Sequence, residues 1–367
     1  MSIEDRVENR GTLACNCTAM VLAAGYGTRL EPLTSTLAKA VVPFLNRPLL
    51  DYTLDWLSRC GFTKAIVNLH HRPESVRACY RDNKFGIDVH FSLEESILGT
   101  AGGPRKVLER LGSRALIVNG DVATTITPEP LWEHHTSSGA LATMALYAGP
   151  AWREFPGIKI DKDGGVTHIP GVETGKSGAG DVASGCFTGI HIVEREVLKL
   201  APENKFCGMV DPIYARLLEE RLPLHGFVVS GNWYEIGTPG RYVSCQLEAL
   251  RREEFPLAFE GYQRLGPGGY GRELVGPMPA SIRPPFMIDK QVKLEGASLI
   301  SGVVAGSEAC VGRGASVLNS VLMKRAKIGA GAYVERCIIL EDAVVPSGAR
   351  CVNQVIAPEV PRRLDEQ

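Results

Sequence analysis

Residues 19–43 read A-M-V-L-A-A-G-Y-G-T-R-L-E-P-L-T-S-T-L-A-K-A-V-V-P, and this stretch decides how the chain is interpreted. The apolar run 20–23 has the composition of a buried strand and ends at the loop that contains Gly25 and Gly27. In an open α/β sheet, ligands bind beyond the carboxyl ends of the strands. Glycines let backbone N–H groups approach an anion, and Arg29 and Lys39 add positive charge beside them. The stretch therefore predicts a phosphate-binding loop.

Two common phosphate motifs are excluded by the residues that follow the loop. A dinucleotide fingerprint needs a third glycine near Leu30, and a P-loop needs Gly-Lys-Ser/Thr where residues 28–30 read Thr-Arg-Leu. A G-x-G by itself is most often an ordinary turn between a strand and a helix. The whole string, however, resembles the signature of the sugar-1-phosphate nucleotidyltransferases, G-x-G-T-R-L-x-P-L-T followed by a lysine. In this chain Lys39-Ala40 stands where the family usually has Lys-Pro.

Length and composition limit the possible functions. A chain of 367 residues predicts two domains, and its 40 basic and 41 acidic residues give no charge for binding nucleic acid or a membrane surface. No apolar run reaches the length of a membrane span. We expect residues 1–17 to be a flexible leader without the character of a signal peptide. The ten cysteines lack zinc-site spacing, which favours a reduced, cytoplasmic protein.

Between residues 18 and 252, apolar runs alternate with helical patterns. The runs predict strands at 65–69, 87–92 and 115–118, and the patterns predict helices at 49–59, 74–81 and 104–111. Such alternation predicts right-handed βαβ units and therefore a Rossmann-like layered α/β domain with a mixed, mostly parallel sheet. Further strand patterns follow at 141–147, 157–161, 166–169 and 186–192, and Asp163-Gly164 marks a hairpin turn.

A repeat begins after residues 253–290, whose glycine and proline clusters predict a linker. Apolar or small residues recur with spacings of 6, 5 and 6, so that equivalent positions return every 17 residues. These positions are Leu294, Ile300, Ala305, Val311, Val317, Leu322, Ile328, Val334, Ile339, Val345, Cys351 and Ile356. Gly314, Gly331 and Gly348 keep the same period. The pattern predicts a left-handed parallel β-helix of the hexapeptide type at 291–358, followed by a tail at 359–367. Because such solenoids commonly self-associate, we expect a homo-oligomer formed through the β-helix.

Two carboxylates are candidate metal ligands. Asp121 ends the predicted strand 115–118, so it belongs to the same sheet edge as the glycine loop. It is either a ligand of a phosphate-bound metal, which the loop upstream favours, or a cap of the next turn. Residues 231–239 resemble the family motif W-x-D-I-G-T-P, with Glu235 at the aspartate position, and the T-P predicts a helix from Pro239 to about Arg252. The resemblance implies that Asp121 and Glu235 bind Mg²⁺, and the longer glutamate predicts altered metal affinity or rate.

The resemblance also implies substrate contacts. Residues 98–102, L-G-T-A-G, resemble the element that touches the nucleotide base, although the same segment could be only a helix entry. The implied nucleotide contacts are Leu22, Ala24, Gly25, Gly27, Thr28, Gly99, Thr100 and Gly102. Gly157 and Gly189 stand where sugar-facing small residues are expected. Relatives grip the sugar phosphate with Glu-Lys-Pro, whereas residues 168–171 read His-Ile-Pro-Gly here, and neither Lys159 nor Lys176 occupies the motif position.

The implied reaction is attack of a sugar 1-phosphate on the α-phosphorus of a nucleoside triphosphate, with release of pyrophosphate. Because the nucleophile is already an anion, no catalytic serine or cysteine is needed, and positioning and charge neutralisation supply the catalysis. The resemblance implies that Arg29 binds the departing β,γ-phosphates. It also implies that Lys39 binds the α-phosphate or the incoming sugar phosphate.

Within the family, L-G-T-A-G, His70-His71 and the appended β-helix are most similar to mannose-1-phosphate guanylyltransferases, so GTP and mannose 1-phosphate are favoured. A uridylyl, adenylyl or other guanylyl transferase on a different sugar phosphate is a second possibility. A regulatory subunit that binds an NDP-sugar without making it is a third, supported by Glu235 and the missing Glu-Lys-Pro. The intact loop, Lys39 and Asp121 favour the enzyme. An acyltransferase that uses the β-helix is disfavoured, because residues 291–367 contain no histidine.

Overall fold

The computed structural model describes residues 17–80, 84–150, 152–172, 181–274, 281–297, 299–358 and 361–363. The chain divides into two compact units, and neither of them is continuous in sequence. The sheet unit comprises Met1–Tyr26 and Leu50–Tyr234, and the solenoid unit comprises Gly27–Leu49 and Glu235–Gln367. The expected leader up to residue 16, Lys176 and most of the expected tail lie outside the described residues.

The sheet unit is built on one nine-stranded mixed sheet, whose central strand β1 delivers the glycine loop. Its strands are β1 (Thr18–Leu22), β4 (Lys64–Leu69), β5 (Asp88–Leu93), β6 (Arg114–Asn119), β8 (Ala142–Tyr147), β9 (Gly157–Ile160), β10 (Val166–His168), β11 (Ala183–Glu194) and β12 (Leu224–Val229). β1 pairs in parallel with β4 and β6, and β5 extends this parallel part beyond β4. β11 runs antiparallel to β6, β8 and β9, while β12 is parallel to β8. The predicted α/β class and mixed sheet are confirmed.

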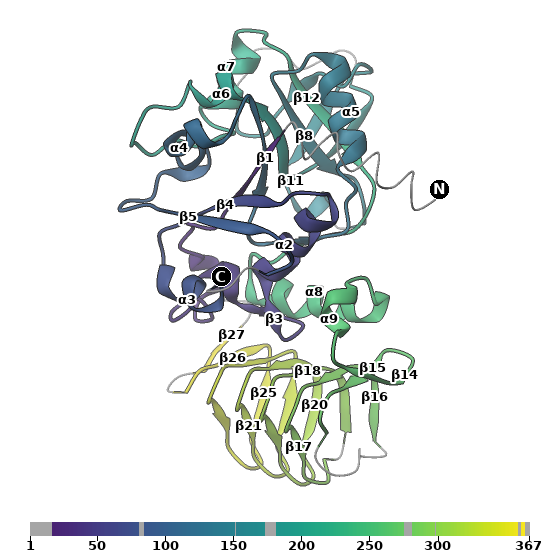
Figure 1. The fold of residues 1–367 in the computed structure, drawn as a ribbon. Helices are drawn as coiled ribbons and strands as arrows, with labels where there is room; N and C mark the ends of the chain where they lie inside the picture. The colour runs from purple at the N-terminus through teal and green to yellow at the C-terminus, as the bar shows by residue number, and fades with distance from the viewer. Residues whose placement is uncertain are drawn as a thin grey trace. The chain divides into compact units, whose positions relative to one another are not determined.

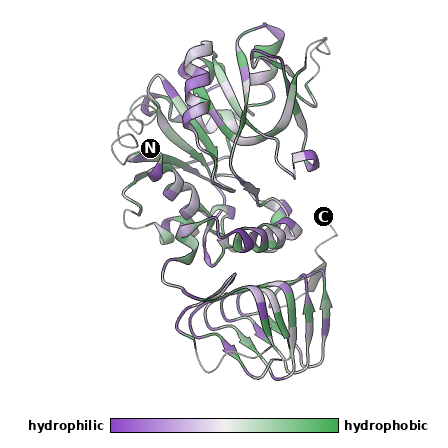
Figure 2. Ribbon diagram, turned by 90° about the vertical axis from the view of Figure 1, so that its right-hand side faces the viewer, coloured by the Kyte–Doolittle hydropathy of each residue, from purple (hydrophilic) through white to green (hydrophobic). Residues whose placement is uncertain are grey.

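Short helices and a two-stranded sheet complete this unit. They are α2 (Leu49–Arg59), α3 (Pro73–Cys79), α4 (Gly99–Lys106), η3 (Leu108–Arg110), β7 (Val122–Thr124), α5 (Glu129–Ser138), η4 (Trp152–Glu154), α6 (Arg195–Leu198), α7 (Ile213–Glu219) and β13 (Trp233–Glu235). α5 packs against β8, β11 and β12, and α4 packs against β1. Figure 1 labels most of these elements, and Figure 2 shows that the strands of the sheet are coloured predominantly as hydrophobic.

The helix predicted at 104–111 is wrong in its bounds. α4 begins at Gly99, five residues earlier, and ends at Lys106 before a separate turn, η3. The early start is possible because the N–H groups of Ala101 and Gly102 donate to the carbonyl of Cys207, at 2.9 and 3.2 Å. Groups of this kind at a helix start otherwise lack a partner. A contact from more than 100 residues away therefore fixes this boundary.

The solenoid unit combines one early segment, Gly27–Leu49, with Glu235–Gln367, which contains the repeat. Its non-repeat elements are η1 (Thr28–Leu30), η2 (Lys39–Val41), β2 (Pro43–Phe44), β3 (Arg47–Pro48), α8 (Pro239–Arg252) and α9 (Pro256–Phe259). The predicted helix from Pro239 is confirmed as α8, and Thr238 caps it by accepting from the Arg241 N–H at 3.4 Å. The side chain of Gln246, fully buried on α8, accepts from the Leu45 N–H at 2.8 Å. This bond, the hydrogen bond from the Tyr242 hydroxyl to the Pro43 carbonyl and the edge-to-face contact of Phe44 with Phe255 explain why residues 27–49 fold with the C-terminal part.

The repeat forms stacked strands, which pair in parallel except for the first two and the last two, which pair antiparallel. These are β14 (Gln263–Gly266), β15 (Gly269–Gly271), β16 (Ile282–Ile288), β17 (Lys293–Leu294), β18 (Leu299–Ala305), β19 (Cys310–Val311), β20 (Ser316–Leu322), β21 (Lys327–Ile328), β22 (Tyr333–Glu335), β23 (Ile338–Ile339), β24 (Val344–Val345), β25 (Arg350–Val352), β26 (Gln354–Ile356) and β27 (Pro361–Arg363). Figure 1 shows the later strands as successive yellow-green coils. The expected linker at 253–290 is wrong in character, because α9, β14, β15 and β16 lie within it and β16 already pairs in parallel with β18.

The register of these strands confirms the 17-residue period. Ile300 pairs with Val317, Val317 with Val334, and Val334 with Cys351. The columns that begin at Leu294 and Ala305 follow the same rule through Val345 and Ile356. All of these columns belong to one continuous apolar core.

Two kinds of glycine shape the coils. Gly314, Gly331 and Gly348 have φ of 72°, 67° and 69°, the left-handed region that favours glycine. Gly329 serves a different purpose, since a Cβ there would lie 2.4 Å from the backbone N of Ser347 in the next coil. A side chain at 329 would therefore push two coils apart.

We predict that Gly329→Ala lowers the free energy of unfolding by about 3 kcal/mol, the upper part of the range for overpacking. Gly331→Asn is the matched control. Position 331 has open space around a Cβ, and asparagine tolerates positive φ, so a change within about 0.5 kcal/mol is expected. Urea unfolding of both variants measures the difference. Equal losses would contradict the stacking argument.

A buried histidine makes the sheet unit sensitive to acid. Burial lowers the pKa of His191 to about 3, and the ring hydrogen bonds to the Tyr214 hydroxyl. The unfolded chain binds a proton there near pH 6.5, so His191 destabilises the fold as the pH falls from about 6.5 towards 3, by up to about 1.4 kcal/mol per pH unit. We predict a shallower loss of stability over this range in His191→Gln than in the parent chain. Parallel curves of unfolding free energy against pH would contradict this role.

Candidate active site

The glycine loop begins where β1 ends, and a buried hydrogen-bonded network holds it there. The Ala23 N–H donates to Asn68 Oδ1 at 2.8 Å, and Asn68 Nδ2 donates to Glu94 Oε1 at 2.7 Å. Glu94 Oε2 in turn accepts from the Leu98 N–H at 2.8 Å. Asn68 and Glu94 are each 2 % exposed. The network therefore joins the start of the glycine loop to the start of the L-G-T-A-G segment.

The two loop glycines differ in what they permit. Gly27 has a φ of 68°, and a Cβ there would lie 3.0 Å from Thr34 Cγ2 and 3.2 Å from Lys39 Cβ. Position 27 therefore needs glycine, because φ is positive there and because Lys39 approaches closely. The sequence analysis had predicted that Lys39 lies beside this loop. A Cβ at Gly25 would meet nothing within 4 Å, so the space beside this backbone is open. Thr28 follows Gly27 as the first residue of η1.

Asp121 belongs to the same edge of the sheet as the start of the loop. The Gly120 N–H donates to the Leu22 carbonyl at 2.8 Å, which ties the end of β6 to the end of β1. Gly189 reaches the same edge, since a Cβ there would lie 2.4 Å from the side-chain nitrogen of Asn119. The sequence prediction that Asp121 shares this edge is therefore confirmed, and Leu22, Ala24 and Gly25 lie along the same strand end.

Tyr26 is a loop residue that sequence reasoning missed. Its hydroxyl lies 3.1 Å from His70 Nε2, and its ring contacts both His70 and His71. His70 Nδ1 is 2.9 Å from the carbonyl of Glu94. Tyr26 is 47 % exposed, so these rings form an aromatic group at the surface beside the loop. The position of an aromatic residue between two loop glycines was the sequence feature that could have identified Tyr26.

The L-G-T-A-G segment has a structural explanation of its own. Cβ atoms at Gly99 and Gly102 would lie 2.6 and 2.7 Å from the backbone carbonyls of Cys207 and Lys205. Thr100 Oγ1 accepts from the Met209 N–H at 2.8 Å. Close packing against residues 205–209 accounts for the small residues, so contact of this segment with a nucleotide stays a prediction.

The two expected sugar-facing positions differ in their surroundings. Gly189 lies beside Asn119, whereas Gly157 starts β9, where a Cβ would lie 3.1 Å from the Trp152 ring. Lys159 Nζ forms an ion pair with Asp181 at 3.0 Å. Of the two lysines considered for the sugar phosphate, Lys159 is thus already paired, and Lys176 lies outside the described residues.

In the solenoid unit, Glu235 lies near two guanidinium groups. Its carboxylate is 3.6 Å from Arg29 Nη2 and 3.4 Å from Arg241 Nε. The Arg29 side chain is 71 % exposed and Glu235 is 14 % exposed. Because the guanidinium of Arg29 is well solvated, its pair with Glu235 at 3.6 Å contributes little to stability. Arg241, on the first turn of α8, was not identified from the sequence. A basic residue shortly after the T-P was the sequence feature that could have indicated it.

Trp233 anchors the strand that delivers Glu235. Its Nε1–H donates to the carbonyl of Thr188 at 3.0 Å, and the indole is buried. A Cβ at Gly237 would lie 2.2 Å from Glu235 Oε1, so glycine leaves the room that this carboxylate occupies. The residues around the W-x-E-I-G motif therefore set the position of the Glu235 carboxylate.

The candidate metal ligands fit the chemistry of magnesium. Mg²⁺ prefers oxygen ligands and is commonly bound by one or two carboxylates together with substrate phosphates. Asp121 and Glu235 each supply a carboxylate. In the described part of the chain, no three or more His, Cys, Asp and Glu side chains form a metal-binding group. Asp121 in the sheet unit and Glu235 in the solenoid unit therefore stay candidate ligands.

The predicted site residues are distributed over both units. Asp121, Gly25, Gly99, Thr100, Gly102, Gly157 and Gly189 belong to the sheet unit, and Gly27, Thr28, Arg29, Lys39 and Glu235 belong to the solenoid unit. The divisions fall after Tyr26 and after Tyr234, inside the two motifs expected to handle phosphate. None of the helices in the described ranges combines the length and apolar character needed to cross a membrane.

Comparison with known proteins identifies the family. The nucleotidyl transferase family model matches residues 18–252, well over half of the chain. The chain belongs to the nucleotidyl transferase family. A second model, the GlmU-like C-terminal hexapeptide, matches residues 284–361, which together with the parallel register is consistent with the predicted left-handed β-helix.

Several relatives carry the name of a sugar-1-phosphate nucleotidyltransferase, which confirms the resemblance. A UTP–glucose-1-phosphate uridylyltransferase of Synechocystis is 27 % identical over 332 residues, covering 85 % of this chain and 84 % of that protein. A mannose-1-phosphate guanylyltransferase of Mycobacterium tuberculosis is 26 % identical, covering 84 % and 80 %. A mannose-1-phosphate guanyltransferase of Debaryomyces hansenii is 29 % identical, covering 64 % and 66 %. The crystal structure of HddC from Yersinia pseudotuberculosis shares the fold, with a TM-score of 0.52, 23 % identity and coverage of 63 % and 99 %.

We predict that Asn68→Asp makes stability depend on pH, because it places a second carboxylate against Glu94. One of the two carboxyl groups then keeps its proton in the folded state, which raises its pKa. The variant should therefore approach the stability of the parent near pH 4 and fall progressively below it by about 2 kcal/mol or more as the pH rises. Unfolding free energies measured from pH 4 to 8 test this, with Asn204→Asp, at an exposed position, as a control outside the network. A constant difference across the range would contradict the network.

Proposed function

We propose that this nucleotidyl transferase moves a nucleoside monophosphate from a nucleoside triphosphate to a sugar 1-phosphate, with Mg²⁺, and releases pyrophosphate. The observation that carries the proposal is the shared sheet edge of the glycine loop and Asp121, within a chain whose relatives are named for this reaction. Open backbone at Gly25 gives a phosphate access to the loop. The match over residues 18–252 supports assigning the reaction to this part of the chain.

The residues of the chain act by binding and neutralising phosphate. A sugar phosphate oxygen attacks the α-phosphorus, and the bond from that phosphorus to the bridging oxygen breaks, so that pyrophosphate leaves with the electron pair. No proton has to be removed from the nucleophile. Exposed Arg29 binds the leaving phosphates, and Lys39, packed against Gly27, binds the α-phosphate or the sugar phosphate. Asp121 and Glu235 would hold magnesium, which neutralises phosphate charge when bound.

The best-supported substrates are GTP and mannose 1-phosphate. This preference rests on the number of relatives named mannose-1-phosphate guanylyltransferases, one of which spans both the sheet and the hexapeptide region. A second candidate is UTP with glucose 1-phosphate, favoured by the Synechocystis relative, which covers 85 % of the chain. Few pocket contacts distinguish bases, so substrate tests decide between them.

Two earlier expectations remain part of the proposal. The nine cysteines in the described ranges are thiols and not disulfides, which supports a reducing compartment such as the cytoplasm. The flat sides of the stacked coils are the surfaces through which we expect the β-helix to self-associate.

Pyrophosphate release identifies the substrates. The full chain is incubated with Mg²⁺, one of GTP, UTP, ATP, CTP or dTTP, and a panel of sugar 1-phosphates. Turnover with one pair names the enzyme. Absence of turnover with every pair, together with thermal stabilisation by an NDP-sugar, would replace the enzyme with a regulatory binding protein.

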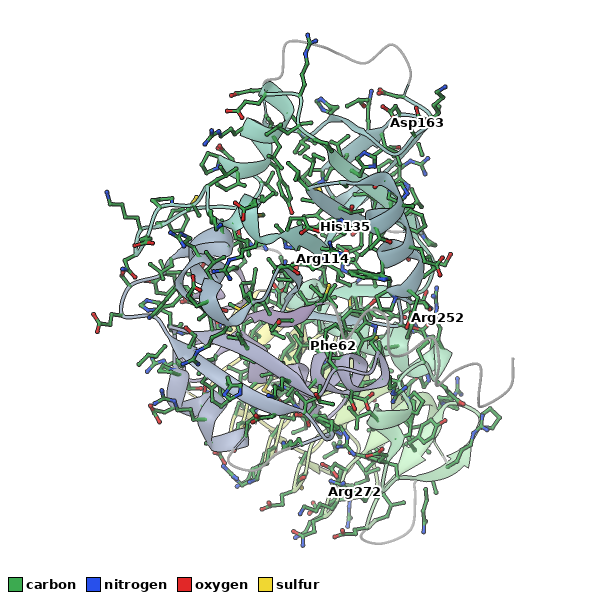
Figure 3. All side chains as sticks on the ribbon, turned by 45° about the horizontal axis from the view of Figure 1, so that its top comes forward. Phe62, Arg114, His135, Asp163, Arg252 and Arg272 are labelled. Atoms are coloured by element: carbon green, nitrogen blue, oxygen red, sulfur yellow. The ribbon has the colours of Figure 1, made fainter. Side chains whose placement is uncertain are left out.

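We predict that Asp121→Asn lowers kcat by about 10²-fold or more, because a neutral amide binds Mg²⁺ poorly. Asp163→Asn is the control: Asp163 is an exposed residue of the β9–β10 hairpin turn, and this variant should retain full activity. Asp163 is labelled in Figure 3. Equal activities of the two variants would refute a metal role for Asp121.

A further inference from the structure

An open groove runs along α8, within the solenoid unit. One wall is a stripe of this helix, and the other consists of three corner residues of successive solenoid coils, Asn319, Arg336 and Asn353. The stripe comprises Gly240, Val243, Ser244, Leu247, Glu248, Arg251 and Arg252. The groove has a volume of about 930 Å³, within the upper range of small-molecule sites. None of these residues belongs to the proposed phosphate-transfer machinery.

The charge of the groove is positive. Three guanidinium groups, those of Arg251, Arg252 and Arg336, face one carboxylate, Glu248. Arg252, labelled in Figure 3, is paired with Glu248 at 2.8 Å and with Glu254 at 3.4 Å. Within the described ranges, neither Arg251 nor Arg336 has a carboxylate within 4 Å. Two guanidinium groups are therefore available to an anion.

Arg336 stands at an unusual backbone position. The equivalent corners of neighbouring coils are Gly302, Asn319 and Asn353, with φ of 64°, 47° and 54°, and Arg336 has a φ of 50°. Glycine and asparagine tolerate this left-handed conformation, whereas arginine there is uncommon. The repeat thus carries an arginine where its own pattern supplies asparagine, and this arginine lines the groove.

The floor of the groove differs from its rim. Val243 and Leu247 are 5 % and 4 % exposed, so they form the base of the groove and offer a small apolar area, while Ser244 and Asn353 add hydrogen-bonding groups. An apolar floor with a few polar groups suits the body of a small molecule, and arginines suit a phosphate. The net charge of the whole chain is −1, so the positive charge is local and fits a small anion better than a polyanion.

We propose that this groove binds a small phosphate ester, with its phosphate on Arg336 and Arg251 and its sugar or base on Val243 and Leu247. A sugar phosphate and a nucleoside diphosphate share this chemistry. The proposed catalytic function is not required for such binding, so the two proposals can fail separately.

Isothermal titration calorimetry at low ionic strength tests the site. The probes are glucose 6-phosphate, GDP and inorganic phosphate, titrated into the full chain and into Arg336→Asn, Arg251→Gln and Arg313→Gln. Arg336→Asn adopts the residue of the neighbouring corners, so the fold should be kept. Arg313→Gln removes the same charge from an exposed solenoid position outside the groove.

At least one ester is expected to bind the parent chain and Arg313→Gln alike and to bind both groove variants tenfold or more weakly. Inorganic phosphate alone should bind more weakly, since it lacks a body for the apolar floor. Stronger binding of GDP would identify the ligand as a nucleoside diphosphate, and stronger binding of glucose 6-phosphate would identify it as a sugar phosphate. Arg29→Gln separates the sites, because groove binding survives this change whereas binding at the glycine loop does not.

Three results would overturn the proposal. They are the absence of binding by every probe at millimolar concentration, equal affinity in Arg336→Asn and the parent chain, and loss of binding only in Arg29→Gln. Sedimentation of the same variants covers one further outcome. A change in oligomeric state in Arg336→Asn without any effect on ester binding would assign the groove to a second copy of the chain and reject the ester.

Discussion

The arrangement of the candidate site depends on the hydrogen bond between the Ala23 N–H and the buried side chain of Asn68. The last residues of a central strand need partners for their backbone groups, and the pairing of β1 with β4 and β6 ends at Leu22, one residue before Ala23. Asn68 provides an acceptor and passes its own donor to Glu94, which holds Leu98. One amide side chain thus fixes where the strand stops and the glycine loop begins.

The same constraint explains why the loop can serve phosphate chemistry. With Ala23 fixed and Gly120 bonded to Leu22, the ends of β1 and β6 are held together, and Asp121 follows directly. Beyond Tyr26 the chain joins the solenoid unit, where Gly27 packs against Thr34 and Lys39. Residues 27–49 are retained there by buried bonds such as Leu45 to Gln246. Local backbone contacts, rather than long-range charge, therefore position the residues that we propose to bind phosphate, in a chain of nearly neutral net charge.

Sequence reasoning predicted those features that repeat or that follow directly along the chain. The 17-residue period could be predicted because every coil buries equivalent residues. The position of Asp121 could be predicted because the carboxyl ends of parallel strands share an edge of the sheet. The start of α4 was not, since it depends on the carbonyl of Cys207, more than 100 residues away. Strand β16 was not predicted because it contains Pro284-Pro285, which is unusual in a strand. The contact between Arg241 and Glu235 was not predicted because it depends on how α8 is oriented. Asn68, Glu94 and Tyr26 carry no motif that distinguishes them from ordinary strand-end and loop residues.

Hydrogen–deuterium exchange of the full chain with Mg²⁺ and a nucleoside triphosphate measures the central claim most directly. The account predicts that amides of residues 24–29 gain protection when the nucleotide is added, whereas the Ala101 and Gly102 amides, already bonded to Cys207, change little. Unchanged exchange at residues 24–29 under saturating nucleotide, with protection confined to other segments, would contradict the assignment of this loop to phosphate.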